Sequence, residues 1–224
     1  RPFEFKELLR QCFNMGNRSL VLVGVTGFIL GLVFTLQSRP TLLEFGAVSW
    51  MPSMVSISIV REIGPVIIAL ICTGRISSGI GAELGSMRVT EQIDAMEVSG
   101  TNPFKYLVVT RIMAATLILP LLIIFGDAIA LFGSALVENL KGNVSFLLYF
   151  NKVFDALKFS DIIPATIKSF FFGFAIGLVG CFKGYNCKKG TVGVGEASNS
   201  AVVYTSMLLF IIDFIAVFIS DIFF

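Results

Sequence analysis

Five long apolar segments constrain this chain more than any other feature of its sequence. A helix needs about 20 predominantly apolar residues to cross the hydrocarbon core of a bilayer. Five segments meet that requirement: residues 19–37, 50–73, 107–137, 162–182 and 201–223. Only 14% of the residues are charged, whereas soluble domains carry roughly 25%. We therefore predict an all-α integral membrane protein with five transmembrane helices.

The first 18 residues show a different pattern. Phe5, Leu8, Leu9 and Cys12 recur at helical spacing, with polar residues mainly between them. This pattern is typical of an amphipathic helix that lies in the membrane interface, although a helix packed as in a soluble protein is an alternative. We predict an interfacial helix over residues 1–18.

The distribution of Lys and Arg predicts the orientation, because cytoplasmic loops are enriched in both. With a cytoplasmic N-terminus, that side holds eleven basic residues: Arg1, Lys6, Arg10, Arg18, Arg75, Arg88, Lys105, Arg111, Lys183, Lys188 and Lys189. The other side holds four: Arg39, Lys141, Lys152 and Lys158. We therefore predict a cytoplasmic N-terminus and, with five spans, a periplasmic C-terminus.

The composition argues against several classes of function. Histidine is absent, which removes the usual general base and the commonest metal ligand. The four cysteines show no Cys-x-x-Cys spacing, so a zinc or redox site is not indicated. A net charge of +2 without a dense basic tract gives no support for nucleic-acid binding. We expect no catalytic residues, no metal site and no nucleic-acid partner.

Charged residues inside the spans are the first candidate functional feature. An ionisable side chain at the bilayer centre costs about 3 kcal/mol on insertion scales and by default marks a functional cavity. The spans contain five such residues: Arg61, Glu62, Asp127, Lys168 and Asp213. Neighbouring helical residues point about 100° apart, so the first two need separate contacts. A structural ion network that only holds the helices together is the alternative.

Gly64 and Pro65 follow Arg61 and Glu62 in the second span. Proline has no N–H to donate to the carbonyl four residues earlier, and its ring crowds that carbonyl. We therefore predict a break or loosening of the helix beside the charged pair. Irregular backbone at membrane depth is tolerated where it lines protein or a water-filled cavity. A pocket of mixed charge with apolar walls would suit an amphipathic ligand.

The segment between the second and third spans, residues 74–106, contains a short amphipathic helix. Thr90 is placed to cap this helix and Gly100 to end it. Its apolar face is formed by Val89, Ile93 and Met96. Its acidic residues are Glu91, Asp94 and Glu97. The apolar face needs a cover, which the membrane surface, the protein itself or a partner subunit could provide.

Two glycine patterns carry less information. Gly81 and Gly85 form a small-xxx-small pair that permits close helix packing. The stretch GTVGVGE, Gly190–Glu196, lacks the GK[ST] ending of a P-loop and follows no predicted strand. We interpret it as a flexible cytoplasmic loop. An ATP-driven transporter built on this chain would therefore need its ATPase on another polypeptide.

Three stretches resemble one known family: Arg61–Ala114, which contains ELGSMRVTEQIDAM; Ser169–Tyr185, SFFFGFAIGLVGCFKGY; and Gly193–Val203, GVGEASNSAVV. The family is that of the MlaE/YrbE permeases of ABC transporters. The resemblance covers nearly the whole chain and is consistent with a single permease domain, residues 1–224. Members usually carry further residues before the position of Arg1, so we expect the interfacial helix to be incomplete here.

The resemblance implies a multi-pass permease of the bacterial inner membrane that moves phospholipids between the inner and outer membranes and maintains outer-membrane lipid asymmetry. Members work as homodimers with a cytoplasmic ABC ATPase dimer and a periplasmic oligomer of MCE-domain proteins, often with a STAS-domain protein. The ATPase would bind ATP and Mg²⁺, and this chain would hold no cofactor.

The resemblance also assigns roles to residues. The lipid cavity would contain Arg61, Glu62, Lys168, Asp213 and Asp127. The block Glu83–Gly100 matches the region that docks on the ATPase, and its candidate coupling residues are Glu83, Thr90, Glu91, Ile93, Asp94, Met96 and Glu97.

Two other functions remain open on the sequence. A proton-coupled secondary transporter would use Glu62, Asp127 or Asp213 as a proton relay. An odd number of spans and the lack of a visible internal repeat in the sequence count against it. A membrane scaffold that transports nothing would use the buried charges for stability alone.

Overall fold

The computed structural model describes residues 5–188 and 190–223, with side chains through residue 220. Five helical segments are long and apolar enough to cross a membrane: Phe5–Glu44, Val48–Val89, Phe104–Gly142, Phe159–Tyr185 and Thr191–Ser220. The described residues contain no strand. The predicted all-α membrane fold with five spans is therefore confirmed. Arg1 and Lys189, which were counted for orientation, lie outside the described residues.

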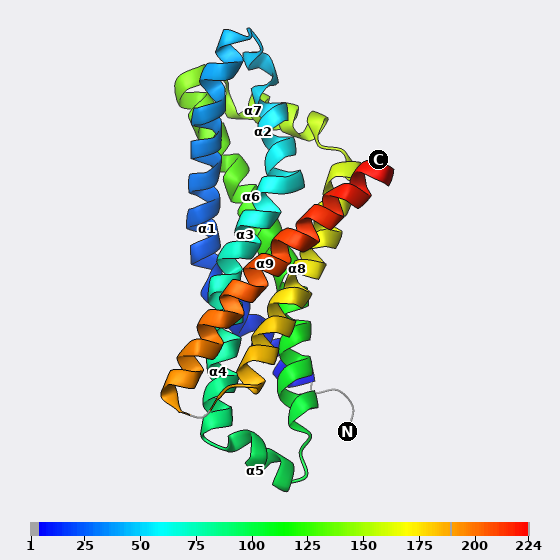
Figure 1. Cartoon of the computed structure of the whole chain (residues 1–224). Helices are drawn as coiled ribbons and strands as arrows, with labels where there is room; N and C mark the ends of the chain where they lie inside the picture. The colour runs from blue at the N-terminus through cyan, green and yellow to red at the C-terminus, as the bar shows by residue number, and fades with distance from the viewer. Residues whose placement is uncertain (1–4, 189, 224) are drawn as a thin grey trace.

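The helices form an elongated bundle (Figure 1). Four long helices are α1 (Phe5–Glu44), α6 (Thr110–Gly142), α8 (Phe159–Tyr185) and α9 (Thr191–Phe223). The second span is assembled from η1 (Val48–Trp50), α2 (Met51–Ser58), η2 (Ile59–Ile63), α3 (Gly64–Cys72), η3 (Thr73–Ser77) and α4 (Ser78–Val89). The short α5 (Gln92–Val98) lies at one end of the bundle, and η4 (Phe104–Val109) then leads into α6. A further helix, α7 (Phe146–Ala156), lies near the opposite end.

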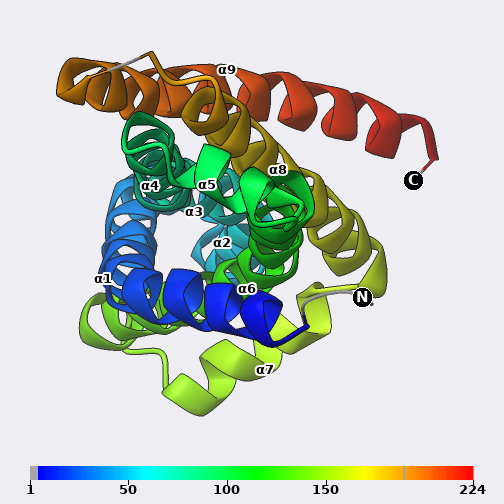
Figure 2. The ribbon, with the colours of Figure 1, turned by 90° about the horizontal axis from the view of Figure 1, so that it is seen from below.

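The first turns of α1 differ in direction from the rest of that helix. Figure 2 shows them running across the α5 end of the bundle before α1 turns along the long axis. The predicted interfacial helix is thus continuous with the first span rather than a separate element. Phe5, Leu9 and Phe13 are exposed on these turns, while Leu8 is buried. The interfacial location of the segment stays a prediction.

Small residues allow α1 and α6 to pack backbone to backbone. A Cβ atom at Gly27 would lie 2.7 Å from the carbonyl oxygen of Gly126, and one at Gly31 would overlap the carbonyl oxygen of Ala130. Helices in membranes associate through such close approaches, because lipid provides no hydrophobic force between them. A similar glycine contact joins α8 to α6, where Gly173 faces the backbone of Ala115.

The predicted loop at Gly190–Glu196 is wrong, because α9 begins at Thr191 and includes the glycines that follow. Glycine has a low intrinsic helix propensity, but tertiary packing overrides propensity. Here Gly193 packs so closely on Lys188 that a Cβ atom would meet the lysine's carbonyl oxygen.

Helix α7 was not predicted from the sequence. The Ser145 hydroxyl caps its start by accepting a hydrogen bond from the N–H of Leu148, 3.3 Å away. The buried Tyr149 hydroxyl donates to the Ser134 hydroxyl of α6 at 2.6 Å. Burial raises the pKa of Tyr149 to about 12. An eleven-residue helix is too short to be recognised as a span, and its amphipathic pattern was overlooked.

The close contact between α1 and α6 can be tested with Gly31→Ala. We expect this change to destabilise the protein by about 1–3 kcal/mol, because the added methyl group forces the two backbones apart. The measurement is thermal unfolding of the purified protein in detergent. Gly195→Ala is the matched control, because its Cβ atom would meet no described neighbour within 4 Å. Equal effects of the two substitutions would contradict the packing argument.

Candidate functional site

The second span is irregular at Arg61 and Glu62. Both residues lie in η2, a π-helical segment in which the N–H of Gly64 donates to the carbonyl of Ile59, five residues earlier. Pro65 then occupies the first turn of α3. A π-helical turn is a way to accommodate a residue that cannot donate the regular hydrogen bond. At Gly64 and Pro65 the helix therefore loosens without separating into two pieces.

Lys168 is the centre of the charged cluster. Its side chain on α8 is only 4% exposed, and its Nζ atom donates to Glu62 Oε2 at 2.6 Å and to Asp213 Oδ1 at 3.0 Å. Three separate elements, η2, α8 and α9, therefore meet at one ammonium group. A buried charge of this kind needs such partners, because an unpaired ion is costly to remove from water.

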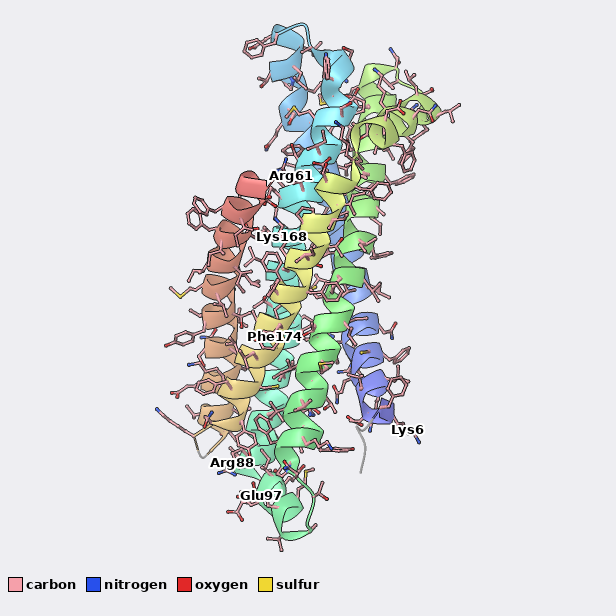
Figure 3. The ribbon with its side chains drawn as sticks, turned by 90° about the vertical axis from the view of Figure 1, so that its right-hand side faces the viewer. Lys6, Arg61, Arg88, Glu97, Lys168 and Phe174 are labelled. Atoms are coloured by element: carbon pink, nitrogen blue, oxygen red, sulfur yellow. The ribbon has the colours of Figure 1, made fainter. Side chains whose placement is uncertain are left out.

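Arg61 points to a different partner, as expected for the residue next to Glu62. Its Nη1 atom lies 3.9 Å from Asp161 Oδ1 in the first turn of α8. Figure 3 shows Arg61 and Lys168 in the half of the bundle that contains α7. The cluster is therefore closer to the α7 end than to the α5 end.

A pocket of about 390 Å³ opens beside the cluster. Arg61 and Glu62 form its charged side, and their side chains are 43% and 38% exposed. The rest of its lining comes from α9: Phe214, Val217, Phe218 and Ser220. The pocket thus combines an ion-paired floor with aromatic and aliphatic walls, which is the chemistry that a molecule with a charged head and apolar tails requires.

Asp127 does not join the hydrogen bonds of Lys168. This residue of α6 is 7% exposed, and its Oδ1 atom accepts no hydrogen bond from any described residue. The carboxylate packs on the backbone at Gly64, where a Cβ atom would overlap Oδ1. Asp127 is therefore close to η2, and it lies outside the lining of the pocket.

The predicted coupling region forms a helical elbow between α4 and α5. Thr90 does not cap α5, because its hydroxyl donates to the carbonyl of Ser86 at the end of α4. Glu91 occupies the cap position instead, in a left-handed conformation with φ of 57°. Helix α5 ends at Val98, and Gly100 follows with a positive φ, as predicted.

The protein itself covers much of the apolar face of α5. Ile93 is fully buried in the main hydrophobic cluster, and Met96 packs against that cluster. Arg88 Nη1 at the end of α4 donates to Asp94 Oδ1 of α5 at 2.6 Å, so the two helices are also in contact across the elbow. Glu97 remains exposed at the α5 end of the molecule (Figure 3). Val98 beside it is 91% exposed.

Glu83 has a structural contact as well as a place in the predicted coupling block. Its Oε1 atom accepts a hydrogen bond from Nη2 of the buried Arg111 at 2.8 Å. This ion pair ties α4 to the start of α6. The elbow is therefore attached to packed helices rather than to an irregular loop.

Sequence reasoning missed two ion pairs at span ends. Asp161 was not considered as a partner of Arg61, because it precedes the predicted fourth span. Arg39 is predicted on the periplasmic side, and Glu138 directly follows the predicted third span. Glu138 is fully buried, and its Oε1 atom accepts a hydrogen bond from Arg39 Nη1 at 2.5 Å. Their positions beside apolar segments mark these charges as candidates, but the sequence does not show how deeply each segment end is buried.

These observations define a polytopic helical membrane protein with a charged pocket inside its spans and a rigid helical elbow beyond them. Comparison with known proteins assigns the family. The model of the Permease MlaE family matches residues 8–219, and the chain therefore belongs to that family. The resemblance inferred from the sequence motifs is confirmed.

Individual relatives agree with this assignment. A probable ABC transporter permease protein of Rickettsia prowazekii is 39% identical over 223 residues, which cover 100% of this chain and 85% of the relative. The intermembrane phospholipid transport system permease protein MlaE of Haemophilus influenzae is 31% identical over 94% of this chain and 81% of its own length. Protein TRIGALACTOSYLDIACYLGLYCEROL 1, chloroplastic, of Arabidopsis thaliana is 33% identical over 94% of this chain and 60% of its own length.

The central role of Lys168 leads to a stability prediction. We expect Lys168→Met to destabilise the protein by about 3–5 kcal/mol, because it leaves two carboxylates without their buried partner. Adding Glu62→Gln and Asp213→Asn to Lys168→Met should restore most of the loss, since no charge then remains uncompensated. Thermal unfolding in detergent measures both variants. A triple variant no more stable than the single one would contradict the pairing.

Proposed function

We propose that this chain is the membrane-spanning subunit of an ATP-driven transporter that moves phospholipids between the inner and outer membranes. The observation that carries the proposal is the pocket beside Lys168, whose floor is charged and whose walls are apolar. Membership of the MlaE permease family and the name of the Haemophilus relative, an intermembrane phospholipid transport system permease protein, support it. As a permease subunit, the chain would catalyse no covalent reaction.

In the proposed transporter, the phosphate of a lipid headgroup would lie near Arg61, whose guanidinium is partly exposed in the pocket. Guanidinium groups bind phosphate through paired hydrogen bonds. The acyl chains would contact Phe214, Val217 and Phe218 of α9. Glu62 and Lys168 would hold the π-helical segment in place while the lipid enters and leaves.

The exposed surface of α9 supports a homodimer. In the most apolar 18-residue window of α9, 11% of the residues are buried, against 56% for the third span. Figure 2 shows α9 along one side of the bundle. Because α9 also supplies most of the pocket lining, a second copy packed on this helix would complete the walls and shield the lipid.

Membership of the MlaE permease family supports the remaining proposed partners. A cytoplasmic ABC ATPase dimer would bind ATP and Mg²⁺ and dock on the elbow, where Glu91, Asp94 and Glu97 present negative charge. A periplasmic oligomer of MCE-domain proteins would receive or deliver the lipid, and a STAS-domain protein would join the ATPase. In this proposal the chain lies in the inner membrane with a cytoplasmic N-terminus and a periplasmic C-terminus.

Proton-coupled secondary transport is less well supported. Two of the three candidate carboxylates, Glu62 and Asp213, are held by Lys168. Relatives of this chain carry names of ABC transporter permeases. Lipid transfer that persists without any ATPase and collapses with the proton gradient would favour this alternative.

The pocket can be tested with Glu62→Ala in the complex purified with its native subunits. We expect lipid transfer between donor and acceptor vesicles to fall by about tenfold or more, since loss of one charged hydrogen bond corresponds to about 1.5–3 kcal/mol. Retention of the ATPase subunit should not change. Glu44→Ala removes the same charge from the exposed end of α1 and serves as the control. Unimpaired transfer in Glu62→Ala would refute the assigned role of the pocket.

The elbow can be tested with Glu97→Arg, which changes an exposed side chain without disturbing the pair between Arg88 and Asp94. We expect the amount of ATPase that co-purifies to fall by about tenfold, because the reversal places like charges against the partner. Thermal stability of the permease itself should not change. The control is Asp155→Arg, which makes the same charge reversal at an exposed residue of α7, near the opposite end of the bundle. Full ATPase retention in Glu97→Arg would place the docking surface elsewhere.

A further inference from the structure

A second cavity lies at the other end of the bundle from the charged pocket. It is bounded by the first turns of α1 and by η3 and α4, and its volume is about 440 Å³. Ligand-binding sites commonly have volumes of about 300–1,000 Å³. Its charged and hydroxyl-bearing lining residues include Glu7, Arg10, Arg18, Ser19, Arg75 and Glu83. We refer to it as the α1–α4 cavity.

The acidic residues of this cavity are already neutralised. Glu7 accepts a hydrogen bond from Gln11 Nε2 at 2.8 Å, and its Oε2 atom lies 3.8 Å from Arg10 Nη1. Glu83 is paired with the buried Arg111, at 2.8 Å between Oε1 and Nη2. Neither carboxylate is therefore available to balance further positive charge in the cavity.

Two arginines in the same cavity lack such compensation. Arg18 of α1 and Arg75 of η3 form no ion pair with any other described residue. They come from two different spans, yet both line the one cavity. Two guanidinium groups without counter-charges create a positive site for an anion.

A third observation concerns the wall of the cavity. Ser19 is fully buried, and its Oγ atom has no hydrogen-bond partner among the described residues. Buried hydroxyl groups are nearly always satisfied, so an unsatisfied one in a cavity wall needs an explanation. A bound oxyanion would accept a hydrogen bond from this hydroxyl, which would then no longer be unsatisfied.

From these features we propose that the α1–α4 cavity binds the phosphate group of an anionic phospholipid in the leaflet on the α5 side of the membrane. Guanidinium groups match phosphate oxygens in geometry as well as charge. The cavity is separate from the charged pocket, which lies in the half of the bundle nearer α7. The proposed phosphate site is therefore distinct from the pocket through which the transported lipid would pass.

The same turns of α1 indicate a lipid rather than a soluble phosphate. Phe5, Leu9 and Phe13 are 63%, 55% and 68% exposed, and Figure 2 shows this segment running across the end of the bundle. Exposed aromatic and aliphatic side chains on an interfacial segment contact acyl chains. The polar face of the segment, which lines the cavity, is then at the level of the headgroups.

The experiment uses the complex purified in mild detergent and a phosphatidylglycerol that carries a photoreactive group on its headgroup. Cross-linked peptides are mapped by mass spectrometry, so that labelling of the α1 and η3–α4 walls is measured apart from labelling of the pocket near Arg61. We expect Arg18→Gln combined with Arg75→Gln to lower labelling of the cavity walls by about tenfold or more. The control combines Lys6→Gln with Lys141→Gln, which removes the same charge from exposed sites outside both cavities.

Competition identifies the source of the phosphate. Unlabelled phosphatidylglycerol should suppress the cavity labelling, whereas phosphatidylcholine at equal concentration and inorganic phosphate in excess should not. Equal suppression by inorganic phosphate would overturn the lipid assignment, and unchanged labelling in the double arginine variant would overturn the site. The inference does not depend on the proposed transport: the Glu62→Ala complex should lose lipid transfer and keep the cavity labelling.

Discussion

The buried ammonium group of Lys168 is the interaction on which the arrangement of the bundle most depends. It joins carboxylates of η2 and α9 to α8 inside an apolar environment. Neither the ammonium group nor the carboxylates would be stable there without their partners. Close glycine contacts bring α1, α6 and α8 together, but they do not involve α9. The charged cluster fixes the position of the second and fifth spans along α8, and with it the shape of the pocket.

The loosened backbone of η2 has the same origin. Pro65 prevents the regular hydrogen bond to Arg61, and the π-helical turn widens the helix where the side chains of Arg61 and Glu62 must diverge. A regular helix would also direct them about 100° apart. The π-turn adds a local irregularity to a long helix, and the ion pairs of its own residues, Arg61 and Glu62, join it to α8. Gly64 contributes by leaving room for the carboxylate of Asp127.

Much of this arrangement is predictable, because ionisable residues are rare in membrane-spanning segments and are therefore easily recognised in the sequence. Glu62, Lys168 and Asp213 stand out as ionisable residues in apolar segments, and Lys168 is in direct contact with both carboxylates. Asp161 and Glu138 did not stand out, because they lie where apolar segments end and sequence alone does not show how deeply an end is buried. Thr90 was misassigned since its hydroxyl can serve either the helix before it or the helix after it. The start of α9 was missed because glycine-rich sequence indicates a loop unless packing favours a helix.

The second span connects the candidate pocket to the candidate docking elbow. One helical segment, Val48–Val89, carries the pocket residues in η2 and, beyond η3, the α4–α5 elbow. In the proposed transporter, a force applied to the elbow by the ATPase would act along this segment, and the ion pair between Glu83 and Arg111 would also couple it to α6. From Met51 to Val89 the segment is α-helical except at its two π-helical turns, η2 and η3. Bending is most favourable at such irregular turns, and η2 is the turn that supports Arg61 and Glu62. A small rotation of the elbow would therefore change the geometry of the pocket floor without requiring any other span to be rebuilt.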